Sequence, residues 1–473
     1  TGEKNVAVGY VALEANTTGN QNTAVGENAL ADNTTANNNT AIGFDALGDN
    51  LTGSENTSIG AEALQKNTTA DSNTAVGFRA LEETTTGSSN TAVGRDSLEA
   101  NTTGASNTAM GRDALSSNTT ASNNTAFGFG SLLSNTTGDS NVAVGSNALD
   151  ANTTGRLNTA LGKDALSANT TANNNTSIGQ GTLEVNTTGS ENTALGRAAL
   201  NANTTASNNT ALGYFALLTN TTGVQNVAIG SEALKSNLAA SNNVAVGYKA
   251  LSLNTSGTAN NALGRNALRD CTSATGNAAY GQNSLVVVTT GNSNAAYGHD
   301  SGKELTTGSN NVFLGNDSGR ANSPSGSITT GSHNVVLGNN STNNLFCADT
   351  SISASDSRDK TDVADFTKGL DWIKALRPVT YRWDRRTWYG TDEEPFGTPD
   401  GSKKRARLHL GFLAQEALEI EKANGYGDTN DNMLICNLTE DGMSYGMKYE
   451  RLVPILVNAI KELSAKVTAL EAG

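Results

Sequence analysis

Apolar and polar residues recur along most of the chain with one fixed period, and each unit of the repeat is seventeen residues long. The pentapeptide at residues 5–9, Asn-Val-Ala-Val-Gly, returns at residues 22–26 as Asn-Thr-Ala-Val-Gly, and this step holds without a slip through residues 311–315. One more copy at residues 334–338 follows after a longer step of twenty-three residues, which brings the total to 20 copies. A strict repeat of this length is the sequence signature of a stacked repeat architecture.

One unit reads Asn-Thr-Ala-Val-Gly-x-x-Ala-Leu-x-x-Asn-Thr-Thr-Gly/Ala-x-x, and its positions are numbered one to seventeen from the first Asn. The aliphatic fourth position predicts a short strand, which the glycine at position five ends. Positions six to eleven favour a tight corner or about one turn of helix, and Asn-Thr-Thr-Gly supplies turn residues. Each unit is therefore predicted to form one coil of a β-solenoid or β-roll.

Two positions of the unit hardly vary: position five is Gly in all 20 copies, and position nine is Leu in the first 17. A single coil cannot bury its own Val of position four and Leu of position nine, whereas stacked coils bury them as a continuous column. The asparagines of position twelve, such as Asn16, Asn33 and Asn50, are expected to hydrogen-bond from coil to coil as a ladder. Such a core is thin, which favours lateral association of several chains.

Composition agrees with a repeat fold and excludes several classes of protein. The chain of 473 residues has 50 Gly and only 5% aromatic residues, so a thin, regular core is expected in place of ordinary globular domains. A net charge of -14 disfavours nucleic acid as a partner. No run of 18 apolar residues occurs, so no membrane insertion is expected. The chain starts at Thr1 without a Met, and we expect a processed or truncated edge with an anchoring module missing upstream.

The three cysteines, Cys271, Cys347 and Cys436, are far apart and show no metal-ligand spacing, so neither a disulfide framework nor a metal site is predicted. Cys271 stands at position twelve, where Asn is the rule, and is interpreted as a substitution in the ladder. His409 has no partner in sequence for a zinc site or a His-based triad. Arg385-Arg386 and the cluster at residues 403–407 are interpreted as solvated loops. No cofactor is expected.

Beyond residue 345 the sequence changes character: all three Trp and four of the five Pro lie there, which predicts a globular domain. Its last stretch, from Tyr449 to Leu470, has apolar residues spaced 3, 4, 3, 4 and 3 apart, which is the seam of a coiled coil or helical bundle. These seam residues are Val453, Leu456, Ile460, Leu463, Val467 and Leu470. Fewer than three heptads are not stable alone, so partner chains or the rest of the domain must support them. The alternative is an amphipathic helix packed on its own domain.

Four short motifs follow one another in this C-terminal region. Residues 355–360 read Ser-Asp-Ser-Arg-Asp-Lys and residues 376–383 read Leu-Arg-Pro-Val-Thr-Tyr-Arg-Trp; residues 411–416 read Gly-Phe-Leu-Ala-Gln-Glu and residues 449–454 read Tyr-Glu-Arg-Leu-Val-Pro. In this order they resemble the intramolecular chaperone domain of endosialidase tail spikes, a phage tail-fibre and tail-spike family. The repeats resemble the β-roll heads of trimeric autotransporter adhesins and the shafts of phage and algal-virus fibres, although the adhesin repeat has a different length.

The resemblance implies a domain that trimerises, helps the upstream fibre to fold in register, and then cuts itself off. The family's catalytic dyad corresponds to Ser355 as nucleophile and Lys360 as general base, a pair that works only if burial depresses the lysine pKa. The scissile bond is expected at Ser355, either Ala354–Ser355 or Ser355–Asp356. Asp356 and Arg358 are assigned to orienting or ion-pair roles. On one helix, residues five apart lie on different faces, so Ser355 is expected in a strained loop before a helix, or the base comes from another chain.

The expected architecture is mainly β: a trimeric β-roll or β-solenoid shaft over residues 1–345, a linker over 346–354, and a small α+β chaperone domain with a terminal helical segment over 355–473. We expect a virion fibre, a homotrimer that attaches to a receptor or glycan on the host surface through exposed repeat positions six, seven, ten and eleven. A bacterial surface adhesin or extracellular matrix fibre with the same chaperone is the alternative, and a polysaccharide-degrading tail spike is a second one. Self-cleavage is expected to be a single turnover, without activity on an external substrate.

Overall fold

The computed structural model describes residues 2–342, 360–390, 394, 396–439 and 444–472. The chain divides into two compact units, unit 1 (Thr1–Asn294) and unit 2 (Ala295–Gly473). The predicted linker at residues 346–354 lies outside the described residues.

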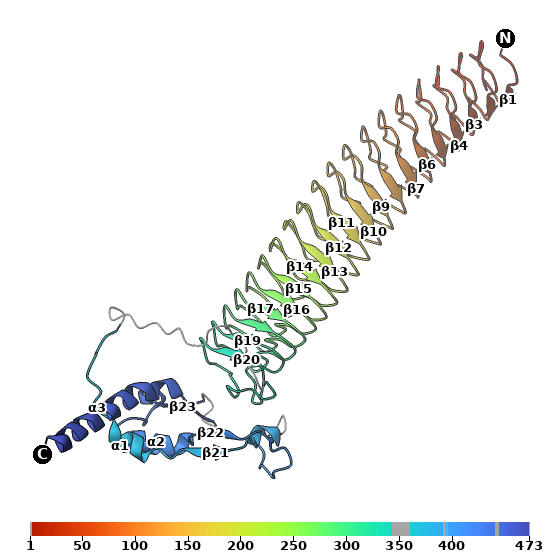
Figure 1. Cartoon of the computed structure of the whole chain (residues 1–473). Coiled ribbons are helices and arrows are strands. Elements are labelled where there is room, and N and C mark those ends of the chain that lie inside the picture. The colour runs from red at the N-terminus through yellow and green to blue at the C-terminus, as the bar shows by residue number, and fades with distance from the viewer. Residues whose placement is uncertain (1, 343–359, 391–393, 395, 440–443, 473) are drawn as a thin grey trace. The chain divides into compact units, whose positions relative to one another are not determined.

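Unit 1 is a parallel β-solenoid in which each copy of the repeat forms one coil with one short strand (Figure 1). Its strands are β1 (Val6–Val8), β2 (Thr23–Val25), β3 (Thr40–Ile42), β4 (Thr57–Ile59), β5 (Thr74–Val76), β6 (Thr91–Val93), β7 (Thr108–Met110), β8 (Thr125–Phe127), β9 (Val142–Val144), β10 (Thr159–Leu161), β11 (Thr176–Ile178), β12 (Thr193–Leu195), β13 (Thr210–Leu212), β14 (Val227–Ile229), β15 (Val244–Val246), β16 (Asn261–Leu263) and β17 (Ala278–Tyr280). Each strand pairs in parallel with the next, and Thr159, for example, lies opposite Thr176. The predicted mainly β solenoid fold is therefore confirmed.

The inside of the coil differs from the prediction at one position. Position three, which is Ala in most coils, is fully buried, as in Ala24 and Ala143. The aliphatic residue of position four instead points outward, and Val8 and Ile42 are 58% and 40% exposed. Because side chains alternate along a strand, only one of these two positions can face inward. Placing Val in the core was wrong; the core is built from Ala and from the Leu of position nine.

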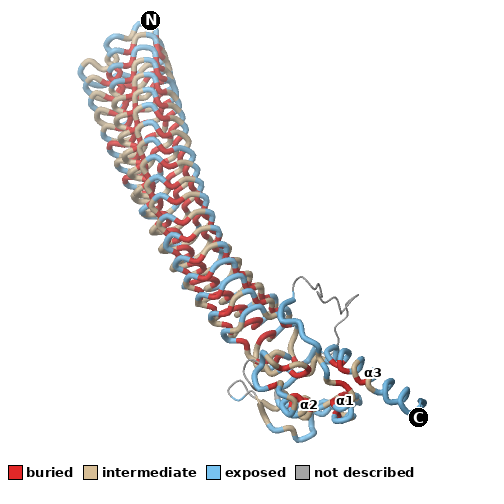
Figure 2. The backbone as a smooth tube through the Cα atoms, turned by 90° about the vertical axis from the view of Figure 1, so that its left-hand side faces the viewer, coloured by how far each residue is buried: buried red, intermediate tan, exposed pale blue. Residues whose placement is uncertain are grey.

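Position three is small because it lies directly against the opposite wall of the coil. Where Ser58 replaces Ala there, its hydroxyl donates a hydrogen bond of 2.7 Å to the carbonyl oxygen of Ala63, at position eight. The larger Phe313 stands at position three in the coil of β19 (Val312–Leu314), where Gly319 replaces the Leu of position nine and a Cβ atom on that glycine would clash with the Phe313 ring. Figure 2 shows the resulting column of buried residues along unit 1.

Positions six to eleven form a tight corner and not a turn of helix. Leu at position nine has a positive φ, 56° in Leu149, and position seven does as well, 55° in Asn147. A left-handed conformation costs a branched residue about 1–2 kcal/mol. Burial offsets this cost, because Leu149 is completely buried and its N–H donates to the carbonyl of Ala165 in the next coil at 3.0 Å.

Glycine at position five is required both by conformation and by space. Gly145 has a φ of +133°, and a Cβ atom on it would lie 2.6 Å from the carbonyl oxygen of Gly162 in the next coil. Since the carbonyl of every neighbouring coil approaches in the same way, the glycine column and the stacking distance of the coils depend on each other.

The predicted asparagine ladder of position twelve is confirmed. The Nδ2 of Asn33 donates to Oδ1 of Asn16 at 3.1 Å, and Asn50 donates to Asn33 at 2.9 Å. Cys271 occupies a ladder position as predicted: it is fully buried, and burial raises the pKa of its thiol to about 11. A second ladder, which was not predicted, runs along position one, where Oδ1 of Asn22 accepts from the backbone N–H of Asn39 at 3.0 Å.

Unit 2 contains three further coils and a small α+β domain. The coils carry β18 (Ala295–Tyr297), β19 (Val312–Leu314) and β20 (Val335–Leu337), and β20 pairs with β19 across the longer last step of the repeat. The domain comprises α1 (Leu370–Ala375), β21 (Val379–Tyr381), the 3-10 turn η2 (Arg386–Trp388), β22 (His409–Gly411), α2 (Ala414–Lys422), η3 (Asn430–Asn432), β23 (Cys436–Leu438), β24 (Tyr445–Met447), η4 (Tyr449–Arg451) and α3 (Leu452–Glu471). β21–β22 and β23–β24 are antiparallel pairs. No helix among the described residues is long and apolar enough to cross a membrane.

The core of this domain packs α1, α2, β23 and the start of α3 around Trp372, which is 2% exposed. Phe366 meets the Trp372 ring edge-on at 5.7 Å, a favourable aromatic geometry. Leu418 of α2, Ile435 and Ile455 of α3 complete the centre of the cluster. α3 therefore contributes one face to its own domain.

The ladder yields a test in the middle of the shaft, where Asn152 donates to Oδ1 of Asn135 at 2.8 Å and accepts from Asn169 at 2.9 Å. Asn152→Asp places a buried carboxylate against the oxygen of Asn135 and is expected to destabilise the shaft by at least about 3 kcal/mol. Asn152→Thr is the control, because Thr84 already occupies a ladder position and accepts from Asn101 at 3.3 Å. Thermal unfolding followed by far-UV circular dichroism measures both, and equal melting temperatures would contradict a structural role of the ladder.

Candidate functional site

The predicted cleavage residues are only partly within the structure. Ala354, Ser355, Asp356 and Arg358 lie outside the described residues. Lys360 is described: it is exposed and belongs to no helix or strand. Their roles in cleavage stay predictions.

The second and third sequence motifs come together in space. Val379 of β21 lies opposite Gly411 of β22, so the two motifs form one antiparallel ribbon. The guanidinium of Arg377 makes a bidentate ion pair with the carboxylate of Glu416 at the start of α2, with its Nε at 3.1 Å from Oε2. This bond raises the pKa of Arg377 and lowers the pKa of the Glu416 carboxyl. Both side chains are exposed, so the pair aligns the ribbon with α2 more than it stabilises the domain.

The fourth motif contacts the β21–β22 ribbon through Tyr449. The backbone N–H of Phe412 donates to the Tyr449 hydroxyl at 3.1 Å. A Cβ atom on Gly411 would lie 2.5 Å from that hydroxyl oxygen, so only glycine leaves room for the tyrosine. Three motifs that are far apart in sequence thus meet at one junction directly before α3.

A buried carboxylate, that of Glu421 in α2, was not identified from the sequence. It is fully buried and accepts backbone N–H bonds from Leu434 at 2.9 Å, Ile435 at 2.6 Å and Cys436 at 2.9 Å. These three bonds attach the turn before β23 to α2. They also supply the hydrogen-bond donors that a carboxylate without access to water requires. Burial, followed by the nearby charge of Glu421, raises the pKa of the Cys436 thiol to about 12, so this cysteine is inert. Acidic residues are common on helix surfaces, so the sequence gives no signal for this role.

The terminal helix α3 is attached to the domain along one side. The side-chain amide of Asn458 donates to the carbonyl of Phe366 at 2.6 Å, and Glu462 accepts from the N–H of Leu370 at 3.2 Å. Leu452, Ile455 and Ala459 are buried on this side. The helix is therefore supported by its own domain, as one of the two interpretations expected.

The predicted seam lies on the other part of the α3 surface and is exposed. Its six residues range from 42% exposure in Leu456 to 81% in Leu470, with Ile460 at 66%. A row of exposed aliphatic residues this long on one helix is typical of a face that packs against another apolar surface.

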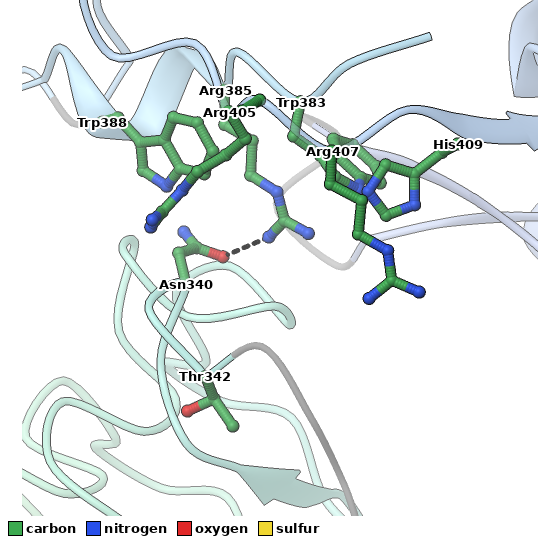
Figure 3. Close-up of a pocket in the computed structure, with 9 residues that line it drawn as sticks. Asn340, Thr342, Trp383, Arg385, Trp388, Arg405, Arg407 and His409 are labelled. Carbon is green, nitrogen blue, oxygen red and sulfur yellow. Dashed lines mark hydrogen bonds between the residues drawn. The ribbon is translucent and has the colours of Figure 1, made fainter. Parts of the chain in front are cut away.

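A cluster of cationic and aromatic side chains lies next to β21 and β22. A cavity of about 370 Å³ in unit 2 is lined by Trp383, Trp388, Arg385, Arg405 and His409, among others. Figure 3 shows these side chains. Arg385 lies 4.3 Å from the centre of the Trp383 ring and Arg405 lies 5.0 Å from that of Trp388. Arg385 also donates to Oδ1 of Asn340 at 2.8 Å, and burial lowers its pKa. Arg385 is thus not the solvated loop residue that was predicted, whereas residues 403–407 are exposed as expected.

One group of possible metal ligands occurs among the described residues: His299, Asp300 and Asp317, whose ligand atoms lie within 4.8 Å of one another. The Asp300 carboxylate is bound by Lys303 at 3.0 Å and by Arg320 at 3.1 Å. Arg320 also binds Asp317 at 2.6 Å. Cationic side chains thus already neutralise these carboxylates, and the group is an ion-pair network.

Comparison with known proteins identifies the C-terminal region. Residues 355–426 match the family model described as "Chaperone of endosialidase". The C-terminal domain is an endosialidase-type chaperone. The match covers three of the four sequence motifs, and the junction at Tyr449 lies beyond it. Searches of curated proteins and of solved structures each found no match to the chain.

The chaperone domain follows a parallel β-solenoid, which is the construction of an endosialidase-type tail fibre. The family match supports a role for this domain in the trimerisation and folding of a fibre or spike protein.

Glu421 provides a specific test of the chaperone core. Glu421→Gln replaces an oxygen acceptor by an amide donor facing a backbone N–H and is expected to destabilise the domain by about 3 kcal/mol. All three Trp lie in this domain, so tryptophan fluorescence during urea unfolding reports on it alone. The control is Glu419→Gln on the same helix, where the side chain is 75% exposed and pairs only weakly with Lys422 at 3.4 Å. Equal unfolding midpoints would show that the three bonds do not stabilise the domain.

Proposed function

We propose that this chain is a fibre for attachment to a host surface, carried on a virion or another extracellular surface, whose chaperone domain aligns three chains and then releases itself by cleavage at Ser355. One observation carries the proposal: two rows of apolar residues, the exposed or half-exposed position four of the shaft and the exposed α3 seam, occur in a chain with an endosialidase-type chaperone. Both rows need a cover of matching shape and length. Two further copies of the same chain provide it.

The shaft row supports lateral association because it is continuous. Position four is apolar in every coil of unit 1, from Val8 to Tyr280, with Met110 as its one thioether, and the flanking position two is mostly Thr or Val. No charged residue interrupts this face of the strands. Identical faces of parallel chains bury the most apolar surface when they are in register, because a shift by one coil leaves one coil at each end uncovered.

The α3 seam supports the role of the chaperone in setting that register. A short helical bundle of three chains brings their C-termini together before the shafts have paired. The helices then fix the three chains at the same residue, and coils can add from this end by nearest-neighbour stacking. Because each coil depends on the one beside it, the initial alignment decides the register of the whole shaft.

The proposed cleavage chemistry rests on the sequence motif that contains Ser355 and Lys360. The neutral amine of Lys360 takes the hydroxyl proton of Ser355, and Oγ then attacks a backbone carbonyl. Attack on the carbonyl of Ala354 passes through a five-membered ring, whereas attack on the serine's own carbonyl needs a strained four-membered ring. The adduct collapses with cleavage of the Ala354–Ser355 bond, and Lys360 returns the proton it took to the leaving amine of Ser355. Water then hydrolyses the ester between Oγ of Ser355 and the Ala354 carbonyl, which leaves a carboxylate at the end of the shaft and restores the hydroxyl of Ser355.

A Ser-Lys dyad needs a lysine that is shielded from solvent, because burial favours the neutral form of the amine. In the single chain Lys360 is exposed. Assembly of the chains is the step that covers it in our proposal. Cleavage is then linked to trimerisation, and a chain that fails to assemble keeps its chaperone.

Ser355→Ala is expected to yield one uncut chain of 48.5 kDa, whereas the wild type separates into the shaft and a C-terminal piece. Denaturing mass spectrometry of the purified protein measures the products and the cut bond. Ser357→Ala, in the same run of serines, serves as control and is expected to cut normally. Equal cleavage in the Ser355→Ala variant would rule out Ser355 as the nucleophile.

The link between assembly and cleavage is tested on α3. Leu463→Asp introduces a charge into the seam, where Leu463 is 52% exposed in the single chain, and is expected to give monomers that remain uncut. Ala465→Asp adds the same charge on another face of the helix and is expected to leave a cleaved trimer. Light scattering measures the mass and gel electrophoresis the cleavage. Full cleavage in monomeric Leu463→Asp would separate the two events and contradict the link.

A further inference from the structure

Residues 193–270, in the last third of unit 1, reverse the charge balance of the preceding shaft. They contain five Lys or Arg residues and two acidic residues, Glu232 and Asp270. Residues 1–192 contain 19 acidic and seven basic residues. Salt screens charges over about 8–10 Å. A local excess of positive charge can therefore attract anionic partners even though the net charge of the whole chain is negative.

The coils place four of these cations around one groove. A depression of about 510 Å³ is lined by Lys235, Lys249, Arg265 and Arg269, together with Tyr248 and Glu232. All six stand at positions six, seven or ten of three consecutive coils. The groove therefore forms on the corner side of the coil, past the glycine that ends each strand.

Two of the cations are neutralised and two are available. Lys235 pairs with Glu232 at 3.3 Å, and Arg269 pairs with Asp270 at 2.7 Å. Lys249 and Arg265 have no carboxylate within 4 Å in the described part of the chain. The ammonium of Lys249 instead lies 5.1 Å from the centre of the Tyr248 ring, which keeps it next to an aromatic surface.

Aromatic residues continue along the same corner toward the N-terminus. Tyr214 and Phe215 stack at 3.8 Å between ring centres, Arg197 lies 6.0 Å from the Tyr214 ring, and Lys235 lies 5.6 Å from the Phe215 ring. Tyr214 and Tyr248 are each 43% exposed. At a spacing of ~4.8 Å per coil, the five coils from Arg197 to Arg265 span ~19 Å. This is an extended strip of alternating rings and cations, suited to a chain molecule.

We propose that this strip, with Tyr248, Lys249 and Arg265 at its centre, binds an anionic polysaccharide that carries carboxylate or sulfate groups. Flat aromatic faces accept the apolar face of sugar rings, and the cations bind the acidic groups through charge-assisted hydrogen bonds. The inference rests on the proposed attachment function and names its ligand class. The strip differs from a surface made only of charged side chains, because its aromatic rings favour sugar rings over other anionic groups.

Nucleic acid is the other polyanion that such a surface could attract. A DNA duplex requires an extended basic stripe for binding. The 19 acidic residues of the coils before this strip repel a duplex that extends along the shaft. A polysaccharide strand is thinner and can stay within the five coils.

The experiment measures binding of the full-length chain to immobilised heparin, hyaluronan, neutral dextran and duplex DNA at 0.15 M salt. Lys249→Gln/Arg265→Gln is expected to weaken binding to the preferred acidic polysaccharide at least about tenfold, and Tyr248→Ala to weaken it further. The matched control is Arg112→Gln/Lys163→Gln, which removes two cations from position six of coils in the acidic part. The control is expected to change binding less than about twofold. Circular dichroism verifies that every variant is folded.

The outcomes separate the ligand from the attachment function. Binding of an acidic polysaccharide that the groove variant loses and the control keeps supports the site. Equal binding by groove variant and wild type, stronger binding to DNA, or binding to dextran alone overturns it. If the chain binds none of the four probes but still binds host cells, the ligand class is wrong and attachment stands. If it binds neither the probes nor cells, both proposals fail.

Discussion

Stacking in register is the constraint on which this protein depends. The asparagines buried in one coil find their hydrogen-bond partners 17 residues away, and the strands pair at the same offset. A coil by itself would leave these polar groups without hydrogen bonds. The free-energy cost of those unpaired groups exceeds the stabilisation from burying the small Ala and Leu core of one coil. The stability of the shaft therefore comes from contacts between stacked coils. A single misplaced coil disrupts the glycine, leucine and asparagine columns at the same time. The strained left-handed leucines persist for the same reason, since the neighbouring coils hold them.

The same constraint explains why the strand face is apolar and why a chaperone follows the shaft. With Ala facing inward and little room for anything larger, the branched residue of position four has to point outward. A uniform apolar face along identical coils offers many wrong registers between chains and little to choose among them. In our proposal the α3 seam makes that choice before the shafts pair. In the same proposal, release of the domain after assembly leaves a shaft that cannot easily retrace its folding route, so its persistence becomes kinetic.

The sequence was sufficient for the period, the coil, the ladder at position twelve and the helical seam, because each repeats a simple rule of spacing. It was misleading for Val8 and its equivalents: the order of apolar residues in a three-residue strand does not reveal which one faces inward, and that depends on the width of the coil. Glu421 and the contact between Gly411 and Tyr449 could not be predicted, since they join residues far apart in sequence through tertiary packing. The groove at Tyr248 needed the coil geometry to bring positions six, seven and ten together. The dyad of Ser355 and Lys360 still rests on the motif.

Chemical cross-linking between chains tests most directly whether position four is the face that three copies share. A cysteine in place of Val144 lies on the strand face, whereas a cysteine in place of Ser146 lies two residues further on, past the glycine. Under mild oxidation of the assembled fibre, we expect covalent dimers from Val144→Cys and almost none from Ser146→Cys. Cross-links of equal yield at both positions, or only at residue 146, would contradict a shaft assembled through its aliphatic row.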